Sequence, residues 1–249
     1  MQSHMIFNTS IGRQKPETII NRQHACPFCE REQLDDIIDQ RGSIILVKNK
    51  YPVLLDTFPT VLIETDECDS ELSIYDKDHL HDLFAFGVEH WLRMEQSGDY
   101  RSVIFFKNHG PLSGGSIRHP HMQISGLKHY DYRLNIAEEQ FRGVLIDRQP
   151  GVECNISTHP RISFYEYNVL LSDFDQLPKL ADYVQMLVRY VVQHRKISSY
   201  NLFFYQLQET IAVKVIPRFP TSPLAIGYGI KQVSNNLDEV AAEIQQLYL

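Results

Sequence analysis

The segment that most constrains this chain is 114–124, which reads Gly-Gly-Ser-Ile-Arg-His-Pro-His-Met-Gln-Ile. Alternate residues of an extended strand project from one face of a sheet, so we expect His119, His121 and Gln123 to point to the same side. Pro120 cannot donate a ladder hydrogen bond, which places the segment at a sheet edge, a strand start or a bulge. The Gly-Gly-Ser turn offers main-chain and hydroxyl donors to an anion. A plain turn leading into a strand is the alternative, but so many polar and special residues together favour a functional site.

Composition excludes several classes of protein. The chain has 249 residues, of which 43% are hydrophobic, enough to bury about 70–75% of the surface of the unfolded chain. The net charge is −7 and no run of Lys or Arg stands out, which disfavours duplex nucleic acid or an anionic membrane as the main partner. No apolar run reaches the roughly 18–20 residues that span a bilayer, and no signal peptide is recognisable. We therefore expect a cytoplasmic protein. The start, Met1-Gln2-Ser3-His4-Met5, resembles a cloning remnant ahead of a native Met5, so the expected fold begins at Met5.

The four cysteines, at positions 26, 29, 68 and 154, are too few and too unevenly spaced for a secreted disulfide framework. Cys26-Pro-Phe-Cys29 has two chemical interpretations. A redox pair would suit the helix-compatible segment 30–39 that follows, but the later Thr/Val-Pro loop of thioredoxin-type proteins is not found. Half of a zinc site is the other interpretation, and it requires two more ligands.

The central segment resembles a known family. Gly-Gly-Ser-x-x-His-Pro-His-x-Gln-Ile is similar to the active-site signature of the galactose-1-phosphate uridylyltransferase branch of the histidine triad (HIT) superfamily, in which glutamine replaces the third histidine of the triad. The Phe-x-Asn-x-Gly that ends at Gly110 also fits, although its asparagine has turn formation as an alternative role. The resemblance implies that His121 and Gln123 are catalytic. It implies that the substrate is bound by Asn108, Gly114, Gly115 and Ser116.

The resemblance also implies a structural zinc site. In the resembled family a strand glutamate is followed four residues later by a zinc-binding histidine, and here Glu64 is followed by Cys68. Thiolate and imidazole both ligate tetrahedral zinc, so the exchange conserves the chemistry. The remaining ligand would be the first histidine of the motif. The implied closed site consists of Cys26, Cys29, Cys68 and His119, with buried cysteines that bind no metal as the alternative.

Hydrophobic periodicity predicts an α+β protein. A helix is expected over 76–96, between strands at 43–48, 60–64 and 103–107. A second group of strands is expected at 152–157, 162–171, 201–207 and 211–216. Further helices are expected from Leu177 to Val191 and over 238–249, the last with Val240, Ile244 and Leu247 inward. Segment 131–141 is expected to be partly helical.

The order strands, helix, strands occurs twice and resembles the duplicated HIT architecture, with mainly antiparallel sheet and flanking helices. We expect two HIT-like halves, 5–135 and 136–249. Where the family often carries His-x-His before Pro-Arg, segment 212–218 reads Ala-Val-Lys-Val-Ile-Pro-Arg. The second half is therefore expected to be degenerate and to lack a second metal site.

The function implied is nucleotidyl transfer from nucleoside-diphosphate sugars or related nucleotide anhydrides to a phosphate-bearing acceptor. It resembles the reaction of UDP-glucose–hexose-1-phosphate uridylyltransferase. His121, largely neutral at pH 7 with an ordinary imidazole pKa of about 6.5, would form a covalent nucleotidyl-histidine. Glutamine does not titrate, which favours a transferase over a hydrolase. Met122 stands where the family has a small residue and is expected to alter the pocket.

Several alternatives stay open at this stage. Uridylyl transfer, adenylyl transfer and phosphorolysis of a dinucleotide are all consistent with the motif. A HIT-like hydrolase and a non-catalytic, zinc-stabilised nucleotide-binding protein are the other classes. The basic stretch Arg13-Gln14-Lys15-Pro16 is interpreted as a solvated arm, with contact to a substrate phosphate as the alternative. A homodimer is expected because the resembled family forms dimers.

Overall fold

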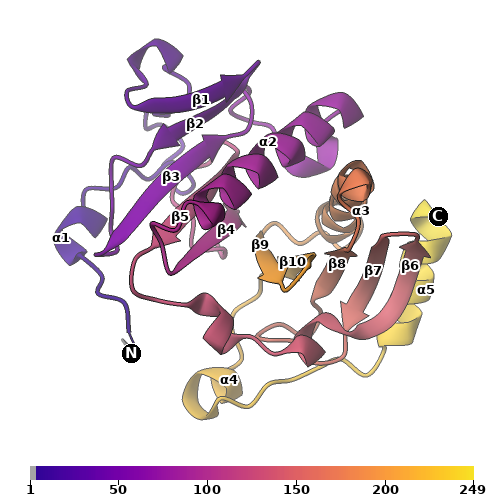
Figure 1. The fold of residues 1–249 in the computed structure, drawn as a ribbon. Helices are drawn as coiled ribbons and strands as arrows, with labels where there is room; N and C mark the ends of the chain where they lie inside the picture. Colours follow the sequence, from indigo (N-terminus) through magenta and orange to yellow (C-terminus); the bar gives the residue numbers. More distant parts are fainter. Residues whose placement is uncertain (1–3) are drawn as a thin grey trace. The chain divides into compact units, whose positions relative to one another are not determined.

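The computed structural model describes residues 4–249, so the first three residues of the opening segment lie outside the described part. Contacts divide the chain into two compact units. The first contains residues up to 71 together with 82–135, and the second contains 72–81 together with 136–249. The boundary between two HIT-like halves at residues 135 and 136 stays a prediction. Figure 1 shows both units in colours that follow the sequence.

The first unit is built on an antiparallel sheet in the order β1-β2-β3-β5-β4. The strands are β1 (Ile37–Arg41), β2 (Ile44–Lys48), β3 (Thr57–Ile63), β4 (Ser102–His109) and β5 (His121–Leu127). A four-residue helix, α1 (Thr9–Gly12), precedes them, and α2 (Lys77–Gln96) connects β3 to β4. The carboxylate of Asp76 caps the N-terminus of α2 by accepting the backbone N–H of His79 at 2.9 Å.

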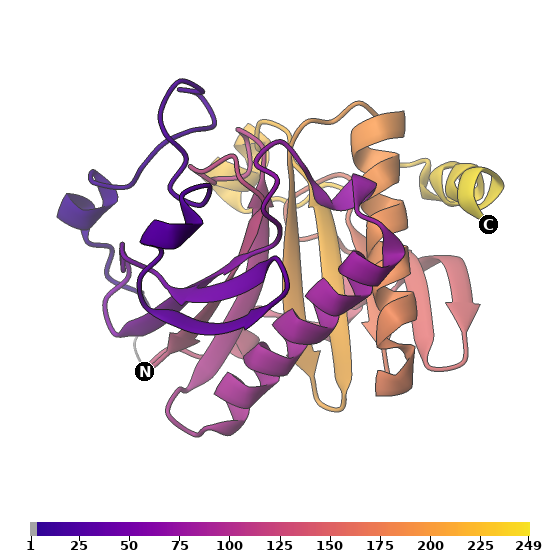
Figure 2. The same cartoon turned by 90° about the horizontal axis from the view of Figure 1, so that it is seen from above.

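Helix α2 packs closely on one face of this sheet. Figure 2 shows the helix lying across the strands of the first unit. A Cβ atom at Gly87 would lie 2.8 Å from the ring of Phe105, so glycine allows the close approach of helix and sheet. Trp91 is fully buried there, and its Nε1–H donates to the carbonyl of Val103 at 2.9 Å.

The other face of the sheet carries the sequence motif. Ile45 and Ile63 lie in register with His121, and Val47 and Val61 lie in register with Gln123. The four aliphatic side chains form a core cluster with Phe28, against which Cys26, Leu34 and Ile117 pack. The cysteine-containing loop is therefore held on the same face as His121 and Gln123.

The second unit has the same strand order, β6-β7-β8-β10-β9, with neighbouring strands antiparallel. Its strands are β6 (Gly143–Gln149), β7 (Val152–Ser157), β8 (Tyr167–Leu171), β9 (Tyr200–Leu207) and β10 (Thr210–Pro217). Its helices are α3 (Leu177–Arg189), which continues into a π-helical turn (Tyr190–His194), α4 (Pro223–Tyr228) and α5 (Leu237–Tyr248). The predicted α+β class, with mainly antiparallel sheet and flanking helices, is confirmed.

Several local predictions were wrong. Segment 30–39 forms a 3₁₀ turn (Arg31–Gln33) and then enters β1, so no α-helix follows the cysteine pair. The strand expected from residue 60 begins earlier, at Thr57, so that β3 includes Pro59, whose carbonyl accepts the backbone N–H of Asn49 at 2.9 Å. Strand β6 was missed because most of its side chains are exposed or half-buried, which hides the hydrophobic alternation.

Two predictions in the second unit also need correction. Strand β8 begins at Tyr167, because Glu166 accepts the backbone N–H of Ile162 at 2.8 Å and that of Ser163 at 3.2 Å, which satisfies donors that a strand would pair. Leu247 is 46% exposed, since the buried side chains of α5 end at Ile244.

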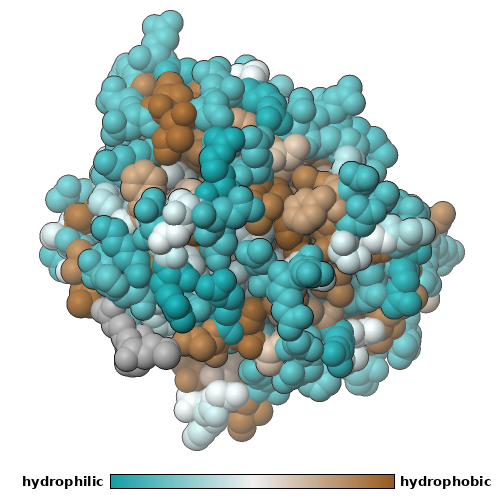
Figure 3. Space-filling model, viewed as in Figure 1, coloured by the Kyte–Doolittle hydropathy of each residue, from teal (hydrophilic) through white to brown (hydrophobic). Residues whose placement is uncertain are grey.

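The surface is largely polar in the view of Figure 3. Exposed apolar side chains gather on α4, where Leu224 and Ile226 are 41% and 73% exposed. Figure 3 shows this as brown surface at the lower edge, where α4 lies in Figure 1. Among the described residues, no helix has the length and apolar character needed to cross a membrane.

Candidate functional site

A single pocket of the first unit collects the residues that the sequence singled out. It encloses about 210 Å³. Its lining includes both predicted catalytic residues, His121 and Gln123, and all four predicted substrate-binding residues, Asn108, Gly114, Gly115 and Ser116.

The orientation of His121 is fixed by the main chain. It is the first residue of β5 and is 7% exposed. Its Nδ1 lies 2.8 Å from the carbonyl oxygen of His119. A carbonyl can only accept, so Nδ1 carries the proton and Nε2 keeps the lone pair. Burial lowers the pKa of His121 to about 4, which keeps the imidazole neutral at pH 7.

Asn108 and the glycine turn are close neighbours because glycine is small. Gly114 has φ +86°, a left-handed conformation that other residues rarely adopt. A Cβ at Gly115 would lie 3.3 Å from the Cβ of Asn108, so glycine lets the turn approach β4. Ser113 braces the turn by donating to the carbonyl of Gly110 at 2.6 Å.

An N-terminal arm completes the pocket. Thr18 is buried, its N–H donates to the carbonyl of Ser116 at 2.8 Å, and its hydroxyl accepts the N–H of Arg118 at 2.8 Å. This clamp holds the preceding Lys15 and Pro16 in the pocket lining. Lys15 is half-buried in this lining, so the interpretation of this stretch as a solvated arm is wrong for Lys15, and the partial burial lowers its pKa.

Other pocket residues were missed by the sequence analysis. The end of β2 and the loop after it contribute Lys48, Asn49, Lys50 and Tyr51. Lys50 pairs with Asp35 of the same pocket, with 3.0 Å between Nζ and Oδ2. The only signal in the sequence was a small concentration of lysine in an acidic chain, and no spacing rule linked it to the motif.

Met122 does not line the pocket, contrary to the expectation that its bulk alters it. It is 1% exposed and pairs with Leu62 on β3 and Lys107 on β4. Strand alternation turns it to the opposite face from His121 and Gln123.

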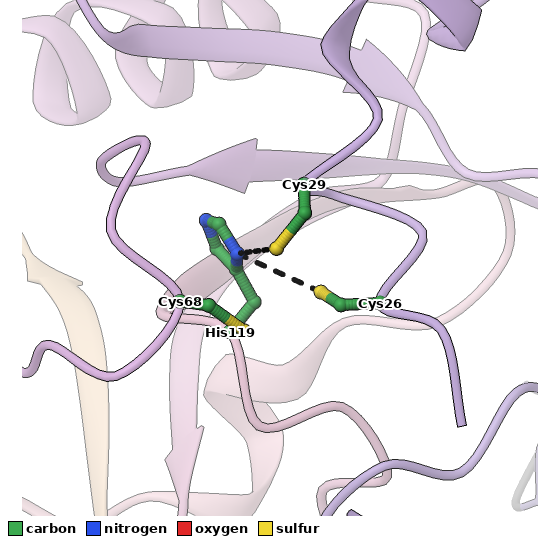
Figure 4. A group of neighbouring side chains, drawn as sticks. All are labelled: Cys26, Cys29, Cys68 and His119. Carbon is green, nitrogen blue, oxygen red and sulfur yellow. Dashed lines mark hydrogen bonds between the residues drawn. The ribbon is translucent and has the colours of Figure 1, made fainter. Parts of the chain in front are cut away.

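The four predicted metal ligands lie together in the first unit. Their ligand atoms are all within 4.8 Å of one another, and Figure 4 shows the side chains converging. The Sγ atoms of Cys26 and Cys29 each lie 3.6 Å from Nδ1 of His119. A tetrahedral zinc site, with Zn–S bonds of about 2.3 Å and Zn–N bonds of about 2.0 Å, would place sulfur and nitrogen about 3.5 Å apart. The geometry therefore fits a four-coordinate metal.

The tautomer of His119 also fits a ligand. Its Nε2 lies 2.8 Å from the carbonyl oxygen of Thr65, so Nε2 carries the proton and Nδ1 presents its lone pair to the sulfurs. Partial burial raises the pKa of the Cys26 thiol, and the neighbouring Cys68 adds to the effect. A bound cation would offset this cost of forming thiolates.

A buried ion pair supports the same corner of the sheet. Glu64, directly after β3, pairs with Lys107 of β4, and both side chains are at most 1% exposed. The N–H of Glu64 donates to the carbonyl of Pro120 at 3.1 Å. The pair therefore lies where the end of β3 contacts Pro120, the residue between the proposed metal ligand His119 and His121.

Comparison with solved structures identifies the class of fold. A uridylyltransferase structure matches with a TM-score of 0.72 at 16% identity, over 90% of this chain and 91% of that chain. An ADP-glucose phosphorylase from Arabidopsis thaliana with bound ADP-glucose matches with a TM-score of 0.74 at 17% identity, over 96% and 95% of the two chains. The chain therefore shares its fold with a uridylyltransferase and an ADP-glucose phosphorylase, in agreement with the fold that the resemblance of the motif implied.

Family comparison then gives a more specific assignment. Models of the N-terminal and C-terminal domains of DUF4931, each described as a domain of unknown function, match residues 7–130 and 133–249. The crystal structure of a DUF4931 family protein from Bacillus cereus is 46% identical, with a TM-score of 0.78, over 85% of this chain and 98% of that chain. This chain belongs to the DUF4931 family. No curated protein matches it.

Proposed function

We propose that the protein is a nucleotidyltransferase that acts on nucleotide anhydrides through a covalent intermediate on His121. The observation that carries this proposal is the fixed tautomer of a buried histidine at a pocket: Nδ1 donates to the carbonyl of His119, and Nε2 keeps the lone pair. An imidazole held in this way is a competent nucleophile at neutral pH.

The first displacement would form one bond and break one bond. Nε2 of His121 attacks the α-phosphorus of a nucleoside-diphosphate sugar or a related anhydride. The bond to the bridging oxygen breaks, and the leaving phosphate takes the electron pair. The Nδ1 proton stays on the ring, where its hydrogen bond to the carbonyl of His119 stabilises the positive charge that develops.

The second displacement regenerates the enzyme. A phosphate oxygen of the acceptor attacks the same phosphorus, and the P–N bond breaks to restore neutral His121. Gln123 and the donors of the Gly114–Ser116 turn would hold the non-bridging oxygens during both steps. Gln123 cannot supply a proton at this position, which favours transfer to a phosphate over attack by water.

The nature of the pocket supports a phosphate-rich substrate. Lys15, Lys48 and Lys50 line it, in a chain with a net charge of −7. The carboxylate of Asp35 is paired with Lys50. Phe28 and the aliphatic residues of the adjoining core cluster offer an apolar wall to a base. A diphosphate or longer polyphosphate chain matches this charge better than an uncharged sugar does.

We propose zinc as the metal of the Cys26, Cys29, Cys68 and His119 cluster. A thiolate-rich, four-coordinate site favours zinc, and four protein ligands leave no open position. The proposed role is structural, since the site joins the cysteine loop to the residue whose carbonyl orients His121. With zinc bound, this loop would be fixed on the pocket side of the sheet.

The test is the mass of the intact protein, measured at neutral pH because phosphoramidates are acid-labile. The protein is incubated with UDP-sugars, ADP-sugars and dinucleoside polyphosphates. We expect a nucleotidyl adduct, whose mass identifies the base, and its loss in His121→Ala. His159→Ala is the matched control, because His159 is an exposed histidine of the second unit.

The acceptor is identified by which phosphate discharges the adduct. Discharge by a hexose 1-phosphate would define a transferase, and discharge by inorganic phosphate would define a phosphorylase. Steady release of nucleoside monophosphate without an acceptor would instead mean a hydrolase. If no donor forms an adduct while nucleotide binding survives His121→Ala, the proposal fails in favour of a non-catalytic binding protein.

A further inference from the structure

Arg118, the residue immediately before the proposed ligand His119, reaches the proposed metal site. Its Nη2 lies 3.6 Å from the Sγ of Cys68, in the geometry of an N–H to sulfur hydrogen bond. Its Nη1 lies 2.9 Å from Oδ1 of Asp69. The backbone N–H of Arg118 is fixed by the hydroxyl of Thr18 at 2.8 Å. The guanidinium is thus held against one particular ligand.

That ligand is the one at which this chain departs from the resembled pattern, with cysteine in place of histidine. The exchange changes the charge of a filled site. Zn²⁺ with two thiolates and two neutral imidazoles is neutral, whereas Zn²⁺ with three thiolates and one imidazole carries a net charge of −1. Cys29 is exposed, whereas Cys26 and Cys68 are half-buried and His119 is fully buried, so the extra negative charge is only partly solvated.

We propose that Arg118 is the charge-compensating partner of Cys68 and thereby sets the metal affinity of the Cys₃His site. The proposal rests on the proposed zinc site and extends it to a residue outside the ligand set. The positive guanidinium restores the neutrality of the filled site, and its N–H donates to the Sγ of Cys68. Arginine suits this role because its planar guanidinium group donates to the sulfur of Cys68 and to the carboxylate of Asp69 at the same time.

The ion pair with Asp69 does not account for the position of Arg118. Asp69 is 75% exposed on its side chain, and exposed pairs contribute little to stability. Asp69 instead restrains the guanidinium from the solvent side. Asp69→Asn therefore serves as a control that weakens this restraint while leaving the charge of Arg118 in place.

The experiment is zinc affinity, measured by competition with a chelator on the full chain. Arg118→Gln should weaken zinc binding by about 10- to 100-fold, the usual effect of losing a residue that supports a metal ligand. Asp69→Asn should change the affinity much less. In a Cys68→His background, where the filled site is neutral without Arg118, Arg118→Gln should have little effect. Charge compensation by Arg118 requires this dependence on the identity of the ligand at position 68.

A second measurement covers the case in which Cys68→His fails to fold or to bind metal. With Co²⁺ in place of zinc, the thiolate-to-cobalt charge-transfer band of Arg118→Gln should move to longer wavelength, because a sulfur that loses a nearby positive charge is more easily oxidised. The melting temperature of the metal-free protein should be unchanged by Arg118→Gln. A purely structural role for Arg118 would lower that temperature and leave the band in place.

The possible failures are distinguishable. Equal weakening by Arg118→Gln in both backgrounds, an unshifted cobalt band, or equal weakening by Asp69→Asn would overturn the role of Arg118 and leave the zinc site standing. A wild-type protein that binds no zinc would overturn the metal site itself, and this inference with it.

Discussion

The two units bury polar side chains against sheets of identical strand order, but they use them differently. In the second unit Lys214 pairs with Glu166 at 3.1 Å and donates to the carbonyl of Gln140 at 2.7 Å, and all three residues are buried. In the first unit His121 and Gln123 line a pocket of about 210 Å³. The same architecture therefore holds a buried Glu–Lys pair in both units, Glu64–Lys107 and Glu166–Lys214, and the first unit has a candidate site in addition.

The charge of Lys214 is held within the protein. Its Nζ lies 5.2 Å from the ring centroid of Phe141, which closes over the ammonium group. Burial lowers the pKa of Lys214 to about 8. In the segment where the resembled family often carries His-x-His, this chain thus has an ammonium with an internal counter-ion. Among the described residues, the first unit alone has a Cys/His/carboxylate group arranged to hold a metal.

Substitution of the proposed nucleophile should have the greatest effect on activity. Because the proposed chemistry is confined to the first unit, His121→Ala should reduce nucleotidyl transfer by about 10⁴-fold or more, as loss of a nucleophile does. The measurement is initial rate, together with proteolytic mapping of the trapped adduct. An adduct on any peptide of the second unit would show that both halves are catalytic.

The next effect concerns stability of the second unit. Lys214→Met leaves Glu166 charged and buried without its partner, so the free energy of unfolding should fall by about 3–5 kcal/mol. The double change Lys214→Met with Glu166→Leu removes both charges and should recover most of the loss. Urea denaturation measures both. If the double variant is as unstable as the single one, the ion pair is not what holds this cluster.

Loss of the proposed metal should lower the stability of the first unit by a comparable amount. Cys68→Ala deletes one proposed ligand, so zinc content should fall from about one per chain and stability should fall by several kcal/mol. Cys154→Ala is the matched control, because Cys154 is buried in β7 of the second unit and outside the cluster. Metal analysis with thermal unfolding tests this prediction. Unchanged zinc in Cys68→Ala would mean that the third ligand is a different residue.

How far the sequence predicted this molecule depended on how local each signal was. The cysteine pair and the motif carry their spacing within a few residues, and the resemblance connected them to Cys68. Strand alternation placed His121 and Gln123 correctly. The same rule, applied to Met122, would have turned it away from the pocket, so that error was avoidable.

Other features had no local signal. The Thr18–Arg118 hydrogen bond joins residues 100 positions apart, and neither residue type indicates a clamp on its own. The pocket roles of Lys15 and of the Lys50–Asp35 pair depend on such contacts. Strand β6 is defined by its backbone pairing with β7, since its own side chains are mostly exposed or half-buried and show no hydrophobic alternation.

Removal of a single positive charge from the pocket should have a more modest effect on activity. Lys15 is a half-buried cation of the proposed phosphate pocket, and Lys231 is an exposed lysine of the second unit. Lys15→Gln should lower kcat/KM for an anhydride donor by about 10-fold, the low end of a hydrogen bond to a charged group, which is worth about 1.5–3 kcal/mol. Lys231→Gln makes the same charge change and should leave kcat/KM unaltered.

Equal effects of the two substitutions would mean that the net charge of the chain, and not a cation in the pocket, attracts the donor. A loss of kcat/KM confined to Lys15→Gln would instead show that this ammonium group of the first unit contributes to the function. Lys15 faces the pocket, whereas Lys214 of the second unit has its counter-ion inside the protein.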